Sequence, residues 1–388
     1  MGGVLLTDAQ QRKTLAAVRS LGSKGIQALA AEETRWTPAG FSRYCQGGLV
    51  YPSPGKKPAE FYQWLQETLP AYGCDVLFPM DDSSLEVVMQ HKEDLAKLCR
   101  LPVPHLDSYR TASDKALAVA AAREAGLDCP ATVAPEKADD LSEVTSKFNF
   151  PVLIKPRKSS GSRGMTAVER PEDLESRYWH VHQQYPWPII QEYLPPGEKY
   201  DVCLLYNRSA ELRASFVQRE IRFFPLERGP STVQESVRHP ELAAQAAHLL
   251  QKLGWCGVAE VEFMVDPRDG KAKFMEINPR FWGSLYMSTL AGVDFPWLLY
   301  RLAMDGDVAG VDTYTVGIKC RWMLPGDILH FLANKKRFSL DPPFFSTKKS
   351  GVYDDIISLD DPFPVMGFFL ACLRYLPDRE MWKTMFQR

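Results

Sequence analysis

Two short apolar segments, joined by a turn and carrying acidic residues at alternate positions, place the strongest constraint on how this chain folds. The first segment covers residues 258–265 and the second covers 273–278. Between them stands Asp-Pro-Arg-Asp-Gly at 266–270, a sequence typical of a tight turn. This arrangement predicts two antiparallel strands joined as a hairpin. The apolar positions of both strands require at least one face of the hairpin to be buried.

Acidic side chains gather on one face of the predicted hairpin. Glu260 and Glu262 share a face of the first strand, and Glu276 and Asn278 share a face of the second. Carboxylates directly opposite one another repel, so strands this apolar need a cation between them. Oxygen ligands without His or Cys nearby favour Mg²⁺ or Mn²⁺. We therefore predict a metal site at Glu262, Glu276 and Asn278; the alternative is an exposed ribbon with solvated glutamates.

A second segment has the features of a phosphate-binding site. Residues 150–155 read as a buried strand that ends in Lys155, and a basic Ser/Gly-rich stretch follows at 157–164. Small residues let backbone N–H groups approach phosphate oxygens, and basic side chains add charge. A flexible hairpin without a ligand is the alternative. The chain has neither a P-loop nor the paired motifs of protein kinases.

Composition narrows the class of protein. The chain has 388 residues and a net charge of −2, so it is long enough for two or three domains and shows no basic excess for nucleic acid. Its eight scattered cysteines predict free thiols in a reducing compartment. The N-terminus has no secretory leader, which favours the cytoplasm. The apolar stretch 365–373 is too short for a membrane span and predicts a buried helix, with a membrane-surface anchor as the alternative.

The first hundred residues alternate short apolar runs with helical patterns. Apolar runs near Val4, at 26–30 and at 75–79 alternate with helical segments around Leu15 and from Phe61 onward. This rhythm predicts an α/β domain with a doubly wound parallel sheet. The glycine-rich fingerprint of dinucleotide-binding domains is absent.

The order of these motifs along the chain resembles the ATP-grasp superfamily. The motifs are Ser113-Asp-Lys115, Phe150-Pro-Val-Leu-Ile-Lys155, Ser160-Gly-Ser-Arg-Gly164, Gln191-Glu-Tyr-Leu194, Glu262 and Glu276-Ile-Asn-Pro-Arg280. The resemblance covers about residues 1–310 and points to the carbamoyl-phosphate-synthase-like branch, which includes carboxylate–amine ligases. It implies an α+β ATP-grasp domain of two lobes that hold ATP between them, preceded by a pre-ATP-grasp domain.

The resemblance implies roles for individual residues. Lys115 and Lys155 match the two ATP-binding lysines, with Lys155 also catalytic. A loop that closes over the triphosphate matches Ser159, Ser160, Gly161, Ser162, Arg163 and Gly164. The metal ligands match Glu262, Glu276 and Asn278, and Arg280 matches the catalytic arginine that steadies an acyl-phosphate.

The adenosine side of ATP has its own matches. Gln191 and Glu192 belong to the hinge segment, where Glu192 is expected to meet the adenine amino group. The backbone at Tyr193 and Leu194 completes this recognition, and Glu198 is expected to face the ribose hydroxyls.

The resemblance also predicts where the domains begin and end. We expect a pre-ATP-grasp domain at 1–112, an ATP-grasp domain at 113–310 and a C-terminal extension at 311–388 that packs on the large lobe. Within the ATP-grasp domain, the small lobe covers about 131–190 and the large lobe about 191–310.

The acceptor side of the site gives weaker signals. Arg219 and Arg222 are candidates to clamp a substrate carboxylate, and Ser231 and Thr232 offer hydroxyl donors in a Gly-Pro-Ser-Thr turn. A surface strand with solvated arginines is the alternative. Asp82 follows a strand of the N-terminal domain, at the edge where doubly wound sheets bind ligands.

Together these features predict an enzyme that joins a carboxylate to an amine through an acyl-phosphate, with ATP and Mg²⁺ or Mn²⁺ as cofactors. Its partners are then small-molecule substrates, without nucleic acid or a membrane span, and a homodimer is possible. Three alternatives stay open: carboxylation through carboxyphosphate, phosphoryl transfer to a stable acceptor, and a nucleotide-binding protein without turnover. The phosphate loop has fewer glycines than that of biotin carboxylases, which favours a stand-alone ligase.

Overall fold

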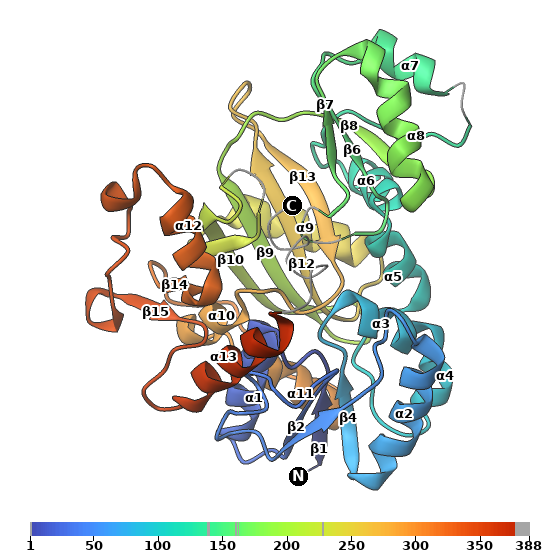
Figure 1. Cartoon of the computed structure of the whole chain (residues 1–388). Helices are drawn as coiled ribbons and strands as arrows, with labels where there is room; N and C mark the ends of the chain where they lie inside the picture. The colour runs from blue at the N-terminus through green and yellow to red at the C-terminus, as the bar shows by residue number, and fades with distance from the viewer. Residues whose placement is uncertain (1, 138–139, 160, 162, 227–228, 377–388) are drawn as a thin grey trace.

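The computed structural model describes residues 2–137, 140–159, 161, 163–226 and 229–376. In this part of the chain, three sheets lie one above another, with the N-terminal sheet at the bottom of Figure 1 and the large sheet in the middle. A smaller sheet stands at the top and faces the large one. Ser160 and Ser162, which belong to the predicted phosphate loop, lie outside the described residues.

The N-terminal domain contains the predicted parallel sheet, in the order β3-β2-β1-β4. Its elements are β1 (Gly3–Leu6), α1 (Arg12–Gly22), β2 (Ala28–Glu32), β3 (Gly47–Val50), α2 (Pro58–Ala71), β4 (Cys74–Phe78), α3 (Asp82–Gln90) and α4 (Lys92–Leu95). All four residues of β1 are buried, because helices cover both faces of a parallel sheet of this kind. The α/β class predicted for this region is therefore confirmed.

Two helices lead from the N-terminal domain into the small upper sheet. They are α5 (Leu106–Ser113) and α6 (Lys115–Glu124). The antiparallel upper sheet has the order β5-β8-β6-β7, and its elements are β5 (Thr132–Val133), α7 (Asp140–Lys147), β6 (Val152–Lys155), β7 (Thr166–Val168), α8 (Leu174–Gln184) and β8 (Ile189–Glu192). Strands β6 and β7 pair through Val152 and Val168, which confirms the two strands expected around the Ser/Gly-rich stretch.

Seven strands form the large sheet, in the order β13-β12-β9-β10-β11-β14-β15. They are β9 (Lys199–Tyr206), β10 (Leu212–Phe223), β11 (Ser231–Ser236), β12 (Gly257–Val265), β13 (Ala272–Asn278), β14 (Lys319–Arg321) and β15 (Val352–Asp354). The remaining helices are α9 (Pro240–Lys252), α10 (Leu285–Ala291), α11 (Phe295–Asp305), α12 (Ile328–Ala333) and α13 (Phe363–Tyr375).

Alternation along β9 explains how the large sheet is covered. Val202 and Leu204 belong to a core shared with α6 and α9, whereas Cys203 and Leu205 belong to a core shared with α1, α10 and α11. Successive side chains of a strand point to opposite faces, so both faces of β9 are buried. Asp201 lies on the same face as Cys203, where the apolar cover ends and the polar site begins.

The C-terminal segment does more than pack on the large lobe. Strand β14 pairs with β11, and β15 extends the same sheet in parallel with β14. One core unites Leu15 of the N-terminal domain, Phe216 of β10 and Ile356 of the C-terminal segment. This core crosses the expected boundaries at 112 and 310, so those boundaries stay a prediction.

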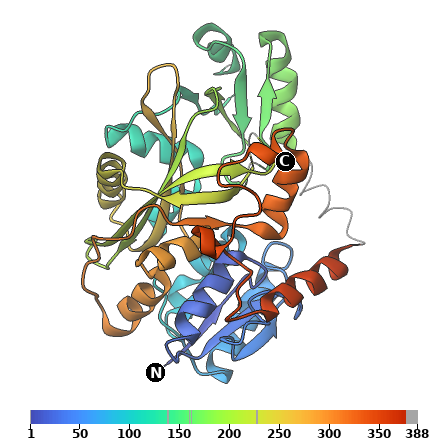
Figure 2. The same cartoon turned by 90° about the vertical axis from the view of Figure 1, so that its left-hand side faces the viewer.

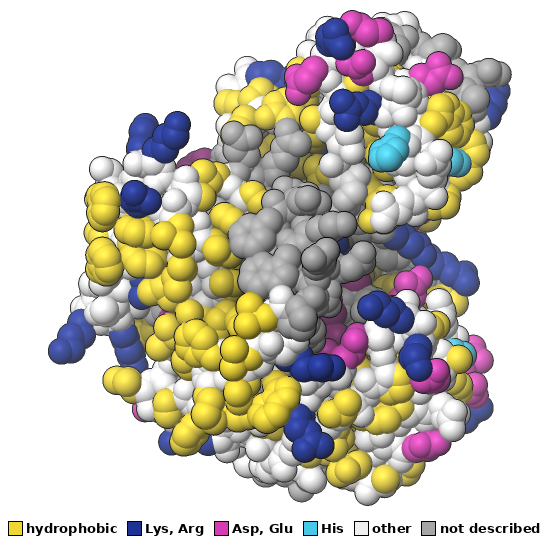
Figure 3. Space-filling view, viewed as in Figure 1, with side chains coloured by type: hydrophobic (Ala, Val, Ile, Leu, Met, Phe, Trp, Pro, Cys, Tyr) yellow, Lys and Arg dark blue, Asp and Glu magenta, His cyan; other side chains and the backbone are white. Residues whose placement is uncertain are grey.

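Helix α13 is buried on one face only. Val365 and Phe368 pack against the main core, while Phe369 and Leu373 are 54% and 62% exposed. Figure 3 shows hydrophobic side chains gathered over α12 and α13 on this face of the molecule. The expected buried helix is therefore half correct. Among the described residues, no helix is both long and apolar enough to cross a membrane.

Candidate functional site

The structure confirms the predicted acidic hairpin and adds its register. Glu260 stands opposite Asn278, and Glu262 stands opposite Glu276. The amide Nδ2 of Asn278 donates hydrogen bonds to Glu260 Oε2 at 3.0 Å and to Glu262 Oε1 at 2.7 Å. Strand β9 adds Asp201, which lies directly opposite Glu262 on its other side. Carboxylates of three adjacent strands thus meet on one face of the sheet.

The electrostatics of this face fit a divalent cation. Burial and the neighbouring carboxylates raise the pKa of Glu262 well above its usual range, and they raise the pKa of Asp201 in the same way. Burial raises the pKa of Glu260 to about 7. Burial and like charges disfavour the ionised form of each group, and a hard cation with oxygen ligands removes this penalty. Glu262, Glu276 and Asn278 therefore form a donor set suited to Mg²⁺.

Two lysines approach the hairpin from outside the large sheet. Lys115, the first residue of α6, places Nζ 2.7 Å from Glu276 Oε2 and donates to the carbonyl of Ser159. Lys155, the last residue of β6, donates from Nζ to Gln191 Oε1 at 2.5 Å. Burial lowers the pKa of Lys155 to about 8, although Glu276 opposes this effect.

A cavity between the small and large sheets joins these groups. The predicted residues that line it are Lys115, Lys155, Ser159, Tyr193, Leu194, Glu262 and Glu276. Its apolar lining was not predicted and consists of Leu153, Met165, Phe223, Leu226, Phe263, Met264 and Met275. Pockets for planar ligands are mostly apolar with a few polar groups. Met264 had a sequence signal, because it stands two residues after Glu262 and shares its face of β12.

The hinge side chains have partners within the chain. Gln191 is buried and donates from Nε2 to Thr132 Oγ1 at 2.9 Å. Glu192 accepts from the backbone N–H of Ala131 at 2.8 Å and from Arg268 at 3.0 Å. Tyr193 and Leu194 line the cavity, whereas Gln191 and Glu192 stand behind it.

Glu198 also stands outside the cavity. It accepts from Tyr200 at 2.9 Å and from Arg219 at 3.1 Å, and its side chain is 56% exposed. In this conformation Glu198 is therefore not placed to contact a ribose in the cavity.

The described part of the phosphate loop lies at the mouth of the site. Gly161 and Arg163 line a second cleft that adjoins the first cavity. Gly164 has a φ of +73°, and a Cβ atom there would lie 2.6 Å from the ring of Tyr185. Glycine is required at this position, because a larger residue would both strain the backbone and collide.

Arg280 is fixed by the N-terminal domain. Its guanidinium makes a bidentate pair with Asp82, at 2.7 Å from Nε to Oδ1 and 3.0 Å from Nη2 to Oδ2. It also donates to Asn278 Oδ1 at 3.2 Å, which links it to the metal ligands. Burial alone lowers the pKa of Arg280, but Asp82 and Asp81 raise it above its ordinary value. Asp82, which was expected to bind substrate, pairs in this structure with Arg280, the arginine expected to be catalytic.

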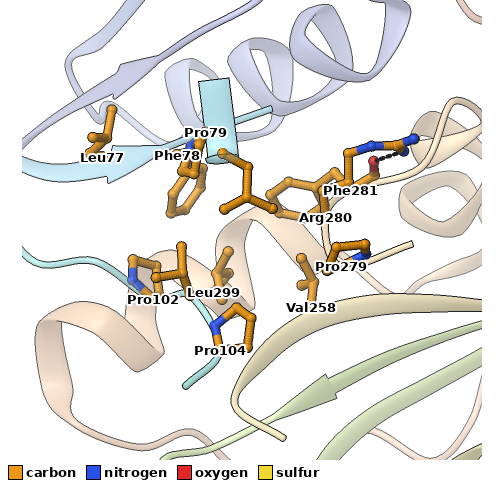
Figure 4. A pocket seen from close by; sticks show the side chains of 12 residues that line it. Leu77, Phe78, Pro79, Pro102, Pro104, Val258, Pro279, Arg280, Phe281 and Leu299 are labelled. Carbon is orange, nitrogen blue, oxygen red and sulfur yellow. Dashed lines mark hydrogen bonds between the residues drawn. The ribbon is translucent and has the colours of Figure 1, made fainter. Parts of the chain in front are cut away.

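Figure 4 shows why Arg280 stays in place. Around a small cavity, Phe78 of β4 and Phe281 approach each other across the seam between the N-terminal domain and the large sheet. Pro102, Val258 and Leu299 complete this apolar seam. The Arg280 guanidinium lies at its edge and donates to the carbonyl of Phe281 at 3.1 Å.

Both candidate acceptor arginines are paired within the chain. Arg219 contacts Glu198 and Glu235, and Nη1 of the buried Arg222 donates to both carboxylate oxygens of Asp327 at 3.0 Å. Neither arginine lines the second cleft. A free carboxylate clamp was expected there, but each guanidinium already has an acidic partner.

Of the two hydroxyl candidates, one lines the cleft. Ser231 does so, whereas Thr232 is fully buried and donates to Asp327 Oδ1 at 3.4 Å.

The second cleft is built from segments far apart in the sequence. This cleft and the first cavity are continuous, because they share four lining residues: Lys199, Asp201, Glu262 and Glu276. The further lining residues that sequence reasoning missed include Gln10, Gln11, Arg12, Lys13, Glu220, Trp322, Leu324, Ile356 and Phe368. They come from both ends of the chain and carry no shared local motif.

Comparison with known families agrees with this geometry. Residues 114–185 match the family model described as the ATP-binding domain of the carbamoyl-phosphate synthase L chain. Residues 185–324 match the model described as ATP-grasp in the biosynthetic pathway with Ter operon.

Similar proteins extend the comparison. The chain is 28% identical over 174 residues to acetyl-CoA carboxylase of Saccharomyces cerevisiae, which is 43% of this chain and 8% of that enzyme. A biotin carboxylase structure from Campylobacter jejuni has a TM-score of 0.70 at 16% identity and covers 82% of this chain and 74% of its own. An L-amino acid ligase from Bacillus licheniformis has a TM-score of 0.60 at 14% identity, over 78% of this chain and 74% of its own.

Two consecutive family models thus cover the small lobe, the hinge and the acidic hairpin without a gap. The solved structures share the fold around these elements. The two models together match residues 114–324, so the chain belongs to the ATP-grasp superfamily.

Proposed function

We propose that this chain is an ATP-dependent ligase that joins a carboxylate to an amine through an acyl-phosphate and releases ADP and phosphate. The observation that carries this proposal is the continuity of the two cavities. Lys199, Asp201, Glu262 and Glu276 line both of them. A nucleotide in the first cavity would therefore present its terminal phosphate to a substrate in the second.

The proposed roles follow from placement. Lys115 and Lys155 would hold phosphate oxygens, and Glu262, Glu276 and Asn278 would hold Mg²⁺. When bound, Mg²⁺ supplies positive charge that neutralises the phosphates. Positioning and charge neutralisation carry most of the catalysis in phosphoryl transfer.

Arg280 lines the second cleft next to Asn278, and Asp82 and Asn278 fix its guanidinium. Such a preorganised donor would stabilise charge that develops on the transferred phosphoryl group. Asp82 would then act as a positioning residue for Arg280.

Carboxylation through carboxyphosphate is the second candidate, supported by the similarity to a carboxylase and a biotin carboxylase. The shape of the second cleft favours the ligase instead. Trp322, Leu324 and Phe368 give it an apolar wall, which has no purpose for an ion as small and polar as bicarbonate. Phosphoryl transfer to a stable acceptor would leave a phosphorylated product.

The wider setting is part of the same proposal. The substrates would be small molecules, and the site of action would be the cytoplasm. Either Mg²⁺ or Mn²⁺ would serve as the metal cofactor. We also propose a homodimer, for which the exposed apolar side chains of α13 supply a contact surface. Light scattering on the purified chain tests this state.

The test of the ligase is ADP release from Mg-ATP with pooled carboxylic acids and amino acids, followed by mass spectrometry of the product. Amide formation is expected, whereas ADP release with bicarbonate and no amine would support carboxylation. Glu276→Gln is expected to lower turnover at least about 100-fold. Glu241→Gln, at an exposed position of α9, is the control and leaves turnover unchanged. Unaltered turnover in Glu276→Gln would contradict the metal assignment.

A further inference from the structure

The second cleft has two walls of opposite character. Trp322, Leu324, Ile356 and Phe368 form an apolar wall, and all four come from the segment after β14 begins. The facing wall is the polar face of the large sheet, which includes Glu220 on β10. A ligand that fits both walls needs an apolar body and a polar group at one end.

The cations around the cleft are already neutralised within the chain. Lys13 pairs with Asp81 at 2.9 Å, and Arg280 pairs with Asp82. Arg12 pairs with Asp355 and also donates to the carbonyl of Ser231 at 3.0 Å. Arg163 belongs to the loop that, by the resemblance to the ATP-grasp superfamily, is expected to close over the triphosphate.

Of the acids that line this cleft, Asp201, Glu260 and Glu262 belong to the metal face, whereas Glu220 lies apart from that face on β10. Its nearest cation is Lys199, with Nζ 4.0 Å from Oε2, at the limit of an ion pair. Burial raises the pKa of Glu220, although Lys199 and Ser231 oppose this effect. A cationic group of a ligand would relieve the burial penalty of this carboxylate.

The distance from Glu220 to the metal face suits a second substrate. Glu220 pairs with Lys199 across β9 and β10, and Asp201 pairs with Glu262 across β9 and β12. Glu220 and Glu262 therefore lie on one face of the sheet, two strands apart. Adjacent strands are about 4.8 Å apart, and the two positions are also offset by two residues along β9, so their backbone separation is about 12 Å.

The apolar wall is held rigidly against the N-terminal domain. Arg19 of α1 donates from Nε to Asp361 at 2.9 Å and to the carbonyls of Asp355 and Ile356. In α13, a Cβ atom on Gly367 would lie 2.4 Å from the carbonyl oxygen of Thr37, so the helix packs directly on the segment between β2 and β3. Figure 2 shows α13 alongside the N-terminal domain. The wall is thus a built part of the cleft.

We infer that the acceptor is a primary amine with an apolar or aromatic body, whose ammonium group contacts Glu220 and whose body packs on Trp322, Ile356 and Phe368. The ammonium group lies across the sheet from the metal face, and the body lies toward the C-terminal segment. The place of this amine in the reaction rests on the proposed ligase function, whereas its binding does not.

Calorimetry with the full chain, Mg²⁺ and a non-hydrolysable ATP analogue tests the inference. The probes are 2-phenylethylamine, butylamine, ethylamine and 3-phenylpropionate. Affinity is expected to rise from ethylamine to butylamine to 2-phenylethylamine, because each step adds apolar surface. The carboxylate 3-phenylpropionate has a similar body and is expected to bind more weakly than 2-phenylethylamine, because Glu220 repels its charge. This comparison uses only the natural chain, so it stands even where a variant fails to fold.

Matched variants assign the two walls. Glu220→Gln and Phe368→Ala are each expected to weaken 2-phenylethylamine about tenfold, through a lost charged contact and lost apolar area. Glu235→Gln is the control for the acid, since Glu235 pairs with Arg219 and does not line the cleft. Phe369→Ala is the control for the wall, since Phe369 is exposed on the same helix. Both controls are expected to retain full affinity.

Three results would overturn the inference: equal binding of 3-phenylpropionate, no gain with body size, or equal loss in Phe368→Ala and Phe369→Ala. The affinity for the ATP analogue is measured in the same proteins. Amine binding without nucleotide binding would remove the proposed ligase and leave the amine pocket standing. Nucleotide binding without amine preference would do the reverse.

Discussion

At the scale of single residues, the site depends on charges held at unusual pKa values. Lys155 ends a buried strand and has its pKa lowered to about 8 by burial. Glu260 has its pKa raised to about 7 for the same reason. In the free protein, burial disfavours the charged form of each group, and an ion of the opposite charge would stabilise that form. Perturbed pKa values of this kind are typical of functional sites.

Lys155 leads to a pH prediction for nucleotide binding. Its pKa of about 8 means that the free protein loses the positive charge as pH rises through 8. The dissociation constant of Mg-ATP is therefore expected to increase above pH 8. Lys155→Arg, which keeps its charge, should flatten this increase. Titration calorimetry between pH 7 and 9.5 measures it, with Lys271→Arg on an exposed turn as the control. An identical pH profile in Lys155→Arg would contradict the role of Lys155.

A second residue-scale prediction concerns stability. Burial and Asp8 raise the pKa of Glu32 from 4.5 to about 8. The folded chain therefore holds a proton that the unfolded chain releases above pH 4.5, so stability falls as pH rises from 5 to 8. One such proton lowers the free energy of unfolding by at most about 1.4 kcal/mol per pH unit.

Urea unfolding at several pH values tests this expectation. Glu32→Gln should make stability less dependent on pH in this window, because the amide does not titrate. Its exposed neighbour provides the matched control, Glu33→Gln, which should keep the dependence of the natural chain. If both variants keep the same slope, Glu32 does not titrate as described.

At the scale of elements, the sheet faces and the C-terminal segment decide where the site lies. The alternation of β12 and β13 places carboxylates on one face and core residues such as Val261 and Ile277 on the other. The segment after β15 crosses back to α1, where Asp361 anchors it. Asp361 is almost fully buried and accepts from Arg19 at 2.9 Å, Ser42 at 2.7 Å and the backbone of Arg43 at 2.9 Å.

This anchor leads to a prediction. Asp361→Ala leaves the buried guanidinium of Arg19 without its carboxylate, which costs about 3–5 kcal/mol in similar cases. The free energy of unfolding is expected to fall by this order, together with affinity for 2-phenylethylamine. Urea unfolding and calorimetry measure the two effects. The exposed neighbour gives the control Asp360→Ala, for which we expect a change within about 0.5 kcal/mol. Equal stability of the two variants would show that the anchor contributes nothing.

At the scale of the whole molecule, the cores and the sheets divide the chain differently. Leu15 of α1, Phe216 of β10 and Ile356 near the C-terminus belong to one core. The small lobe has a core of its own, which includes Ile154 and Tyr178. The cavity between the small and large sheets lies between the parts of the molecule that hold these two cores. A site at such a junction can change shape while both cores stay intact.

Thermal unfolding is expected to follow the cores. Leu15→Ala and Phe216→Ala should lower the midpoint of the same main transition, with losses of about 2–5 kcal/mol each. Ile154→Ala should lower a separate transition of the small lobe, and Mg-ATP should bring the two transitions together. Differential scanning calorimetry makes the comparison. A main transition that ignores either Leu15→Ala or Phe216→Ala would show that the shared core does not unfold as one unit.

Local sequence determined the parts of this protein that depend on short-range patterns. The alternation around Glu262 and Glu276 predicted the hairpin and the face that carries its acidic residues, and Lys155 at the end of an apolar run predicted its place beside the loop. The N-terminal parallel sheet was predictable for the same reason. Strand periodicity and turn chemistry are local properties that a single sequence carries in full.

Only the tertiary structure decided which partners the charged residues have. Arg222 looked like a substrate clamp until Asp327, 105 positions later, proved to be its partner. The second cleft is lined both by Lys13 near the N-terminus and by Phe368 near the C-terminus. Contacts of this kind arise when distant segments bury a common core, and that long-range packing leaves no pattern in the sequence around either residue.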